Sequence, residues 1–237
     1  MPSDVIRQAD GIVLIIPVYN EESILESQLL PLLEAPPFPM SILLAENGSS
    51  DRTREILERL HAAYPALAVI NLPHPNYGLA MRTGLESASG RIAIVDDLDV
   101  LDVDFWKRGI EILAEGVDIV QGSKVLAGRQ DRRPLVRKAA TLALTGLLKL
   151  LFGYPGTDTH GPKILRLEAV KPFLAQCGTE LDIFPTELVL RCVRGGLSIR
   201  EVPIHLREIR ATPLPLRKRV LRALRDLLRL RKALRKG

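Results

Sequence analysis

The chain has 237 residues, of which 46% are hydrophobic and 26% charged, and its formal net charge is +5. This composition supports one substantial core, and its two cysteines lack the spacing of a disulfide framework or a zinc site. The longest nearly apolar run, 142–154, is interrupted by Lys149 and is too short to cross a bilayer, and residues 1–10 lack the apolar region of a secretory signal. We therefore expect a cytoplasmic protein that does not span a membrane.

Apolar runs alternate with helix-like patterns through the first half of the chain. The expected strands lie at 11–18, 41–46, 67–72, 91–96 and 117–122, and the expected helices at about 21–34, 51–63, 78–89 and 103–115. Such alternation predicts an α/β fold with a mostly parallel sheet, helices on both faces, and a ligand site at the carboxyl ends of the strands. We expect one main domain over 1–212, followed by a basic amphipathic helix at 213–237.

Polar side chains follow the first two expected strands at the point where each strand ends. Residues 17–22 read P-V-Y-N-E-E and residues 46–51 read E-N-G-S-S-D. Asn20 and Asp51 are suited to cap the helices that follow them. Capping does not explain Glu46, because a carboxylate at the end of an apolar strand needs a partner.

The fourth expected strand runs into a cluster of carboxylates. Five of them fall within residues 96–104, namely Asp96, Asp97, Asp99, Asp102 and Asp104. Asp102 and Asp104 fit the start of the next helix, where negative charge interacts favourably with the helix dipole. The first three repel one another unless a positive group lies between them, so a cationic partner is expected at this strand end.

Several of these stretches occur together in the order and spacing of a known family. The sequences IIPVYNEE, AENGSSDRT, NYGLAMRTGLESASG, VQGSK, GTDTHGPKIL and FPTELVLRCVRGGLSIREVPI, with the aspartate cluster, resemble family 2 glycosyltransferases of the dolichyl-phosphate mannose synthase-like branch. The similarity covers roughly residues 10–205. It implies a GT-A type nucleotide-diphospho-sugar transferase fold.

The resemblance implies a divalent cation, Mg²⁺ or Mn²⁺, at the aspartate cluster. The family motif D-A-D-L-Q aligns with residues 95–99, where Val95 replaces the first aspartate and Asp99 replaces the glutamine. We therefore assign Asp97 and Asp99 as the metal pair and as catalytic residues, with Asp96 and Asp97 facing the donor. A cation held there would neutralise the leaving nucleoside diphosphate.

The resemblance also implies a nucleoside site at the ends of the first two strands. Pro17, Tyr19 and Glu21 match its P-x-Y-N-E motif, in which Tyr19 would lie against the base or ribose and Glu21 would accept a ribose hydroxyl. Glu46 takes the place of an aspartate that accepts a base N–H.

A third donor element matches the family's G-x-A-x-R-x-G stretch. Gly78 and Arg82 are its donor-binding candidates, although Arg82 is equally consistent with a solvated helix residue. Tyr77 stands where a lysine is frequent in the family, so the resemblance does not carry over that lysine's phosphate contact.

Cations downstream are candidates for holding an acceptor phosphate. Lys124 replaces the arginine of the family's G-S-R, Arg137 belongs to a basic pair beyond it, and Lys163 follows the T-D-T-H-G-P sequence. A phosphate acceptor is already ionised at neutral pH and needs no strong base. An alcohol acceptor needs one, and Asp158 is then the catalytic candidate, although it could also brace its loop.

The basic residues concentrate at the end of the chain. Residues 217–237 hold ten lysines and arginines against Asp226, and leucines recur among them at helical spacing. This pattern suits the interface of an anionic membrane, with packing on the domain or on a second chain as the alternative. Nucleic acid is not expected as a partner, since 217–237 has no aromatic residue for base stacking.

These features predict an inverting, metal-dependent glycosyltransferase bound peripherally at the inner face of the cell membrane. It would move a hexose, mannose or glucose, from a GDP- or UDP-sugar to a polyprenyl phosphate. One alternative is the same fold acting on a soluble or glycan hydroxyl. Another is a peripheral membrane module that binds a nucleotide sugar without turnover, which the departures at Val95 and Tyr77 make conceivable.

Overall fold

The structure is a computed structural model that describes residues 11–128, 135–204 and 216–235. In its two long helices, the side chains of 135–137, 216–222 and 224 lie outside that description. Seven strands form one sheet in the order β3-β2-β1-β4-β6-β5-β7. The strands are β1 (Ile12–Val18), β2 (Ser41–Asn47), β3 (Leu67–Leu72), β4 (Ile92–Val95), β5 (Ile119–Ser123), β6 (Lys163–Arg166) and β7 (Ile199–Pro203).

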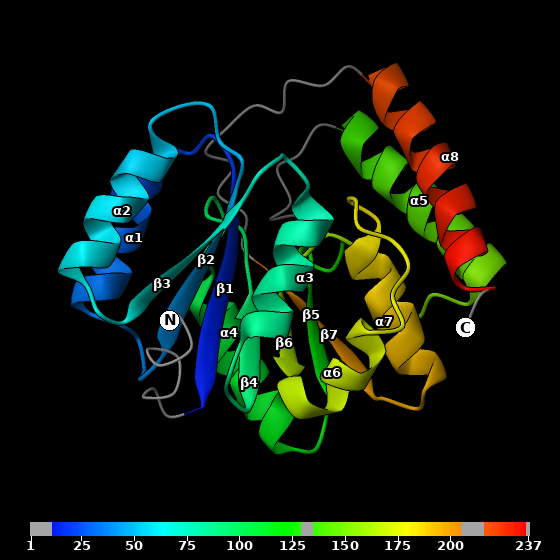
Figure 1. The fold of residues 1–237 in the computed structure, drawn as a ribbon. Helices are drawn as coiled ribbons and strands as arrows, with labels where there is room; N and C mark the ends of the chain where they lie inside the picture. The colour runs from blue at the N-terminus through cyan, green and yellow to red at the C-terminus, as the bar shows by residue number, and fades with distance from the viewer. Residues whose placement is uncertain (1–10, 129–134, 205–215, 236–237) are drawn as a thin grey trace.

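The eight described helices cover both faces and one end of this sheet (Figure 1). They are α1 (Leu25–Glu34), α2 (Thr53–Ala63), α3 (Tyr77–Ser87), α4 (Val103–Ala114), α5 (Leu135–Phe152), α6 (Leu167–Leu174), α7 (Phe184–Arg194) and α8 (Leu216–Ala233). All five strands and four helices expected from the sequence are confirmed within a few residues, as is the mostly parallel α/β fold. None of the helices in the described part of the chain is long and apolar enough to span a bilayer.

Two apolar layers sandwich the sheet because side chains alternate between its faces. Leu14 and Ile16 of β1 pack with α1, α2 and α4, whereas Val13 and Ile15 pack with α3, α6 and α7. Every β1 residue from Val13 onward is buried, as expected for a parallel strand covered on both faces. This rigid centre fixes the loops that follow β1, β2 and β4.

One strand runs against the others. β6 pairs antiparallel with both β4 and β5, and it places Lys163 opposite Val95 and Gln121. The start of β6 therefore lies at the same edge of the sheet as the carboxyl end of β4. Chain segments separated by about 70 residues meet there.

A third apolar cluster lies outside the sheet. It joins Leu148 of α5, Val189 and Leu190 of α7, and Leu227 and Leu230 of α8. Figure 1 shows α5 and α8 side by side along one end of the molecule, next to α7. The described part of α8 thus packs on the rest of the protein through two of its leucines.

Candidate active site

The loops after β1 and β2 are tied together at the carboxyl edge of the sheet. The backbone N–H of Asn20 donates to Ser49 Oγ over 3.0 Å, and Asn20 Oδ1 accepts from the backbone N–H of Ser50 over 2.8 Å. The backbone N–H of Glu21 donates to Thr53 Oγ1 over 2.8 Å. Asn20 has a φ of +53°, a conformation that asparagine tolerates better than most residues. These bonds hold the two nucleoside motifs of the sequence as one unit.

Glu46 is fully buried at the end of β2 and has partners inside the protein. Its Oε2 lies 2.7 Å from the Arg54 guanidinium, and its Oε1 accepts the backbone N–H of Ser49 over 2.5 Å. Burial alone would raise the pKa of Glu46, but the hydrogen bonds from Arg54 and Ser49 bring that pKa below its ordinary value. Glu46 is therefore an ionised brace of the loop that follows it, and Arg54 is the partner that the sequence did not reveal.

Among the other residues of the nucleoside motif, Tyr19 offers an aromatic surface. Tyr19 is 43% exposed just beyond the end of β1, so its ring is available to a planar ligand. Glu21 is half-buried at the start of the turn that leads into α1. Pro17 is buried within β1, opposite Ala45 of β2, and contributes shape rather than a polar contact.

Asp96 is buried just after β4, and both of its carboxylate oxygens are hydrogen-bonded inside the protein. Its Oδ2 accepts from Trp106 Nε1 over 2.7 Å, and its Oδ1 accepts the backbone N–H of Asp97 over 2.8 Å. Burial, with a contribution from Asp97, raises the pKa of Asp96 well above its ordinary value. Both oxygens are thus engaged within the protein, so the structure gives Asp96 the geometry of an anchor for the loop.

Asp97 and Asp99 are both half-buried in the loop that follows β4. Asp97 Oδ1 accepts from the Tyr77 hydroxyl over 3.1 Å. Burial raises the pKa of Asp97, Asp99 raises it further, and the cations of Lys124 and Lys163 oppose both. Asp102 instead caps α4 by accepting the backbone N–H of Phe105 over 2.9 Å, as the sequence predicts.

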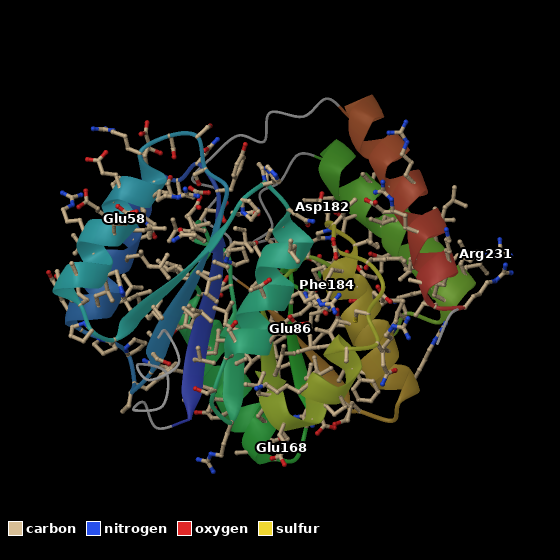
Figure 2. All side chains as sticks on the ribbon, viewed as in Figure 1. Glu58, Glu86, Glu168, Asp182, Phe184 and Arg231 are labelled. Carbon is tan, nitrogen blue, oxygen red and sulfur yellow. The ribbon has the colours of Figure 1, made fainter. Side chains whose placement is uncertain are left out.

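Tyr77 and Gly78 form the first turn of α3 beside this cluster. Burial, and then the charge of Asp97, raise the pKa of Tyr77 well above its ordinary value. The phenol therefore stays protonated and donates a hydrogen bond to Asp97. A Cβ at Gly78 would overlap the backbone carbonyls of Glu180 and Leu181. Gly78 is therefore required by the close approach of the loop before α7, whose Asp182 lies near this end of α3 (Figure 2).

Arg82 is not brought into this group. Its Nε pairs with Glu86 over 2.8 Å and its guanidinium donates to the carbonyl of Cys177 over 3.2 Å. Glu86 lies further along α3 (Figure 2), away from the Tyr77 end of the helix. The Arg82 side chain thus joins α3 to the segment after α6 instead of approaching the aspartate cluster.

Asp158 is buried beneath the loop that follows β5 and carries Lys124. Its Oδ2 accepts the backbone N–H of Lys124 over 3.1 Å, and its Oδ1 accepts the backbone N–H of His160 over 3.0 Å. Burial would raise its pKa, but the charge of Lys124 and these backbone bonds lower the pKa of Asp158 below its ordinary value. A carboxylate in this state holds a loop well and accepts a proton poorly.

Two of the three predicted acceptor cations lie near the aspartates. Lys163 is 2% exposed, and its Nζ donates to the carbonyls of Gly161 over 2.8 Å and Thr159 over 3.2 Å. Burial lowers the pKa of Lys163 to about 8, against the opposing charges of Asp158 and Asp97. Lys124 is half-buried, with its charge felt by both Asp97 and Asp158. The side chain of Arg137 lies outside the described residues.

A buried polar network beneath this loop was not anticipated from the sequence. Gln121 of β5 donates to the Tyr154 hydroxyl over 2.7 Å and also to the carbonyl of Asp158. Glu201 of β7 accepts from the backbone N–H of Thr157 over 2.7 Å and from its hydroxyl over 2.8 Å. A glutamine within an apolar strand and a glutamate within another were the available signals. Together they fix the segment that carries Asp158.

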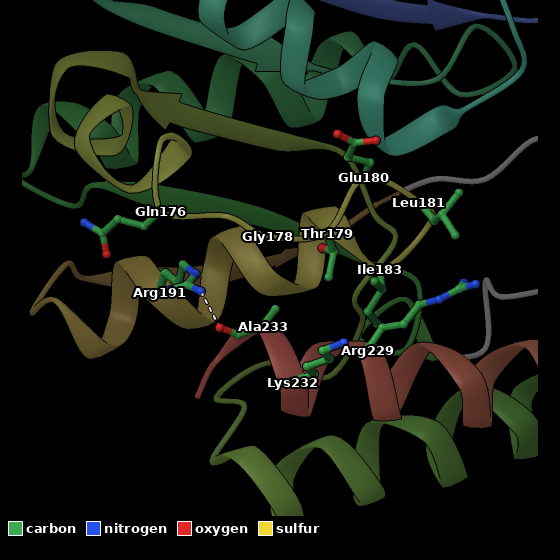
Figure 3. Close-up of a pocket in the computed structure, with 10 residues that line it drawn as sticks. All are labelled: Gln176, Gly178, Thr179, Glu180, Leu181, Ile183, Arg191, Arg229, Lys232 and Ala233. Atoms are coloured by element: carbon green, nitrogen blue, oxygen red, sulfur yellow. Dashed lines mark hydrogen bonds between the residues drawn. The ribbon is translucent and has the colours of Figure 1, made fainter. Parts of the chain in front are cut away.

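Two cavities lie away from the strand ends. One, of about 500 Å³, lies between the loop before α7 and the end of α8, where Arg191 donates to the carbonyl of Ala233 over 2.9 Å (Figure 3). The other, of about 670 Å³, is a groove between the ends of α5 and α8. Neither includes Tyr19 or the aspartates.

The fold and the edge just described define a GT-A type glycosyltransferase. The family model described as glycosyl transferase family 2 matches residues 13–170, and the chain belongs to this family. It is 25% identical over 201 residues to a dolichyl-phosphate hexose transferase of Haloferax volcanii, covering 84% of each chain. It is 26% identical over 212 residues to dolichyl-phosphate beta-glucosyltransferase ALG5A of Trichomonas vaginalis, covering 83% of this chain and 65% of the relative.

A solved structure supports the same fold. Glucosyl-3-phosphoglycerate synthase of Mycobacterium tuberculosis, in complex with Mn²⁺, UDP-glucose and phosphoglyceric acid, matches with a TM-score of 0.66. The sequence identity is 19%, and the match covers 97% of this chain and 82% of the synthase.

Proposed function

We propose that this glycosyltransferase moves a hexose from a nucleoside diphosphate sugar to a polyprenyl phosphate with the help of a divalent cation. The carrying observation is the meeting of Asp97 and Asp99 after β4 with Lys124 and Lys163 from the β5–β6 region. An acidic half would serve the donor diphosphate through a cation, and a basic half would serve a second anion. The names of the two relatives, both dolichyl-phosphate transferases, support this division.

The residues present fit a divalent cation that is completed by the substrate. Asp97 uses one oxygen for Tyr77, and neither its second oxygen nor Asp99 has a hydrogen bond in the described structure. No group of three or more His, Cys, Asp or Glu side chains in the described residues is arranged to hold a metal. Mg²⁺ and Mn²⁺ commonly take one or two carboxylates and complete their shell with phosphates and water. A cation here would relieve the repulsion between Asp97 and Asp99 and neutralise charge on the leaving diphosphate.

Donor recognition is proposed to combine a stacking surface with a braced loop. The exposed ring of Tyr19 would lie against the base or ribose, and Glu21 would accept a ribose hydroxyl. Glu46 would contribute through the shape of the 47–53 loop, because both of its oxygens already have partners. The choice between a GDP- and a UDP-sugar would then rest on backbone groups of that loop.

A phosphate acceptor fits the acceptor side better than a hydroxyl does. Lys124 and Lys163 offer positive charge near the donor, which an anionic acceptor needs in order to approach a diphosphate. A hydroxyl acceptor needs a base, and Asp158 has a lowered pKa and both oxygens engaged. We therefore place Asp158 in the role of holding the loop that carries Lys124.

The transfer would be a single displacement. An oxygen of the acceptor phosphate would form a bond to the anomeric carbon as the bond from that carbon to the diphosphate breaks, which inverts the configuration. The acceptor oxygen is already ionised, so no proton has to be removed. The acceptor's lipid chain would place the enzyme at the inner face of the cell membrane, with the basic helix α8 contributing to a peripheral contact.

Paired acceptors test this proposal. We would first select the donor by the thermal stabilisation that nucleotide sugars give in the presence of Mn²⁺. Release of nucleoside diphosphate would then be measured with a short polyprenyl phosphate and with the matching polyprenol. The proposal expects release only with the phosphate and only with the cation. Equal release with the polyprenol would instead support a hydroxyl acceptor.

A further inference from the structure

Helix α5 has an outward face made almost entirely of apolar residues. Leu150 is 81% exposed, and Leu142, Leu147 and Leu151 are also exposed large hydrophobic residues. Small residues fill the spaces between them, namely Ala139, Ala140, Ala143 and Gly146, all exposed. Among the exposed residues in the described part of this helix only Lys149 is charged, and Lys138 is half-buried. Such a continuous apolar surface is unusual on a protein that has no partner there.

Helix α8, which lies next to α5, supplies positive charge. Leu227 and Leu230 are buried against α5 and α7, so these leucines of the amphipathic pattern are already used inside the protein. Leu228 is 68% exposed beside α5. The exposed cations of α8 and the residues after it are Arg225, Arg229, Arg231, Lys232 and Arg235. Its acid, Asp226, is buried and paired with Arg229 over 3.0 Å.

The two helices enclose a groove that combines both characters. Its volume is about 670 Å³, and its walls are Leu147, Leu151 and Phe152 on one side and Leu228 and Leu234 on the other. Arg194, Arg231 and Arg235 also line it. Figure 2 shows the Arg231 side chain pointing away from the body of the protein, into the solvent.

We infer that the α5–α8 face, made of Leu142, Leu147, Leu150, Leu151 and Leu228 with Arg231 and Arg235, is where the protein lies on an anionic bilayer. The leucines of α5 enter the boundary between headgroups and acyl chains, and the cations of α8 contact lipid phosphates. The sequence pattern assigned the apolar contact to α8, whereas the structure makes α5 its main source. The inference rests on the proposed function only in taking a bilayer as the place where the acceptor is found.

Charge decides between a bilayer and a second copy of the chain. A twofold interface brings the same surface of both subunits together, so Arg231 and Arg235 of one copy would approach those of the other. The described residues of the α5–α8 face offer no exposed carboxylate to pair with them. An anionic lipid surface satisfies both the apolar area and the cations.

The test is co-sedimentation of the full chain with vesicles, without nucleotide sugar or acceptor. We expect binding to vesicles of phosphatidylcholine and phosphatidylglycerol, and weak binding to phosphatidylcholine alone. Binding should weaken as salt rises toward about 1 M, where charges are screened within about 3 Å. Because the assay contains no substrate, its outcome is independent of the proposed reaction.

Leucine variants locate the apolar contact. The double variant Leu150→Gln, Leu151→Gln should lose at least about tenfold in vesicle affinity, because two apolar side chains no longer enter the lipid. Leu126→Gln, which changes an exposed leucine in the loop after β5 and outside the α5–α8 face, is the control and should bind as the wild type does. Unchanged thermal unfolding temperatures would show that all three proteins are folded.

Charge variants test the second half of the contact. The double variant Arg231→Gln, Arg235→Gln should lose about 30-fold in affinity for the anionic vesicles, at about 1 kcal/mol for each cation. The matched double Arg59→Gln, Lys107→Gln removes the same charge from exposed positions elsewhere and should lose far less.

Two results would overturn the inference. One is wild-type binding by the Leu150, Leu151 variant combined with loss of binding when 213–237 is deleted, which would assign the contact to α8 alone. The other is absence of vesicle binding together with a dimer, detected by sedimentation velocity, that the same leucine variant dissociates.

Discussion

The two sides of this site, for which we propose donor and acceptor roles, are built in different ways. On the donor side, β1, β2 and β4 are parallel, and each site loop follows its strand directly. On the acceptor side, the antiparallel β6 and a buried network anchored by Gln121 and Glu201 carry the functional segment. The donor side therefore depends mainly on local sequence, and the acceptor side on contacts between distant segments.

Two aspartates show what this difference means for chemistry. Asp97 is crowded by Asp99, and burial raises its pKa, so it gains from a cation. Asp158 is buried as well, but Lys124 and two backbone N–H groups lower its pKa. Asp97 is therefore not fully compensated and would gain from a bound cation, whereas Asp158 already has its partners inside the protein. We expect substitutions at the two positions to have different consequences.

The largest expected effect is on the donor side. Asp97→Asn or Asp99→Asn should lower cation-dependent turnover by at least about 100-fold, since a cation can contribute several kcal/mol of charge stabilisation in the transition state. The free energy of unfolding should hold or rise, because one of two repelling charges is removed. Turnover at several Mn²⁺ concentrations and thermal unfolding are the measurements. Wild-type activity in both variants would move the cation site elsewhere.

The next effect separates the two sides directly. Lys124→Ala should impair transfer to a short polyprenyl phosphate by about tenfold to 100-fold, because one charge-assisted contact to the acceptor is lost. Donor affinity measured by calorimetry should change much less. Arg137→Ala is expected to behave in the same way. An equal loss of donor affinity would mean that these cations serve the donor diphosphate.

A pH effect should mark Lys163. Its pKa is about 8 in the folded protein and 10.5 ordinarily, so the unfolded chain holds more protons between these values. The free energy of unfolding should therefore rise over this pH range, by about 3 kcal/mol at most, while transfer falls as the folded lysine loses its charge. Lys163→Met should remove both trends. This assignment would be contradicted if the free energy of unfolding and the transfer rate changed in the same direction in the wild type, or if both trends persisted in the Lys163 variant.

The smallest expected effect concerns the contact between the start of α3 and the loop before α7. Gly78→Ala should lower the free energy of unfolding by about 1–3 kcal/mol, because a methyl group there overlaps the carbonyls of Glu180 and Leu181. Denaturant unfolding is the measurement, and Gly146→Ala, at an open position of α5, is the control that should not be destabilised. Equal stability of the Gly78 variant would show that the loop before α7 yields easily.

The sequence was sufficient where structure follows from local pattern. Period and turn residues predicted all five strands through Ser123, and the cap at Asp102 follows from its place before α4. Strand ends also identified Tyr19, Glu46 and Asp97 as residues of one edge.

The rest depended on contacts that no local pattern reveals. Glu46 is satisfied by Arg54, which points back from the following helix, and Arg82 turns toward Glu86 instead of the donor edge. The leucine spacing of α8 did not show which leucines pack on α5. These outcomes follow from which side chains tertiary packing brings together, and a helical or strand period does not encode that choice.

Mass spectrometry and proton NMR of the lipid product would test the proposed transfer to a polyprenyl phosphate directly. The protein would be incubated with Mn²⁺, the donor that stabilises it, and a short polyprenyl phosphate. We predict a hexosyl polyprenyl phosphate whose anomeric configuration is opposite to that of the donor, and we expect no such product when EDTA is added or with Asp97→Asn. A product of retained configuration, or a hexose found only on a hydroxyl acceptor, would contradict this prediction.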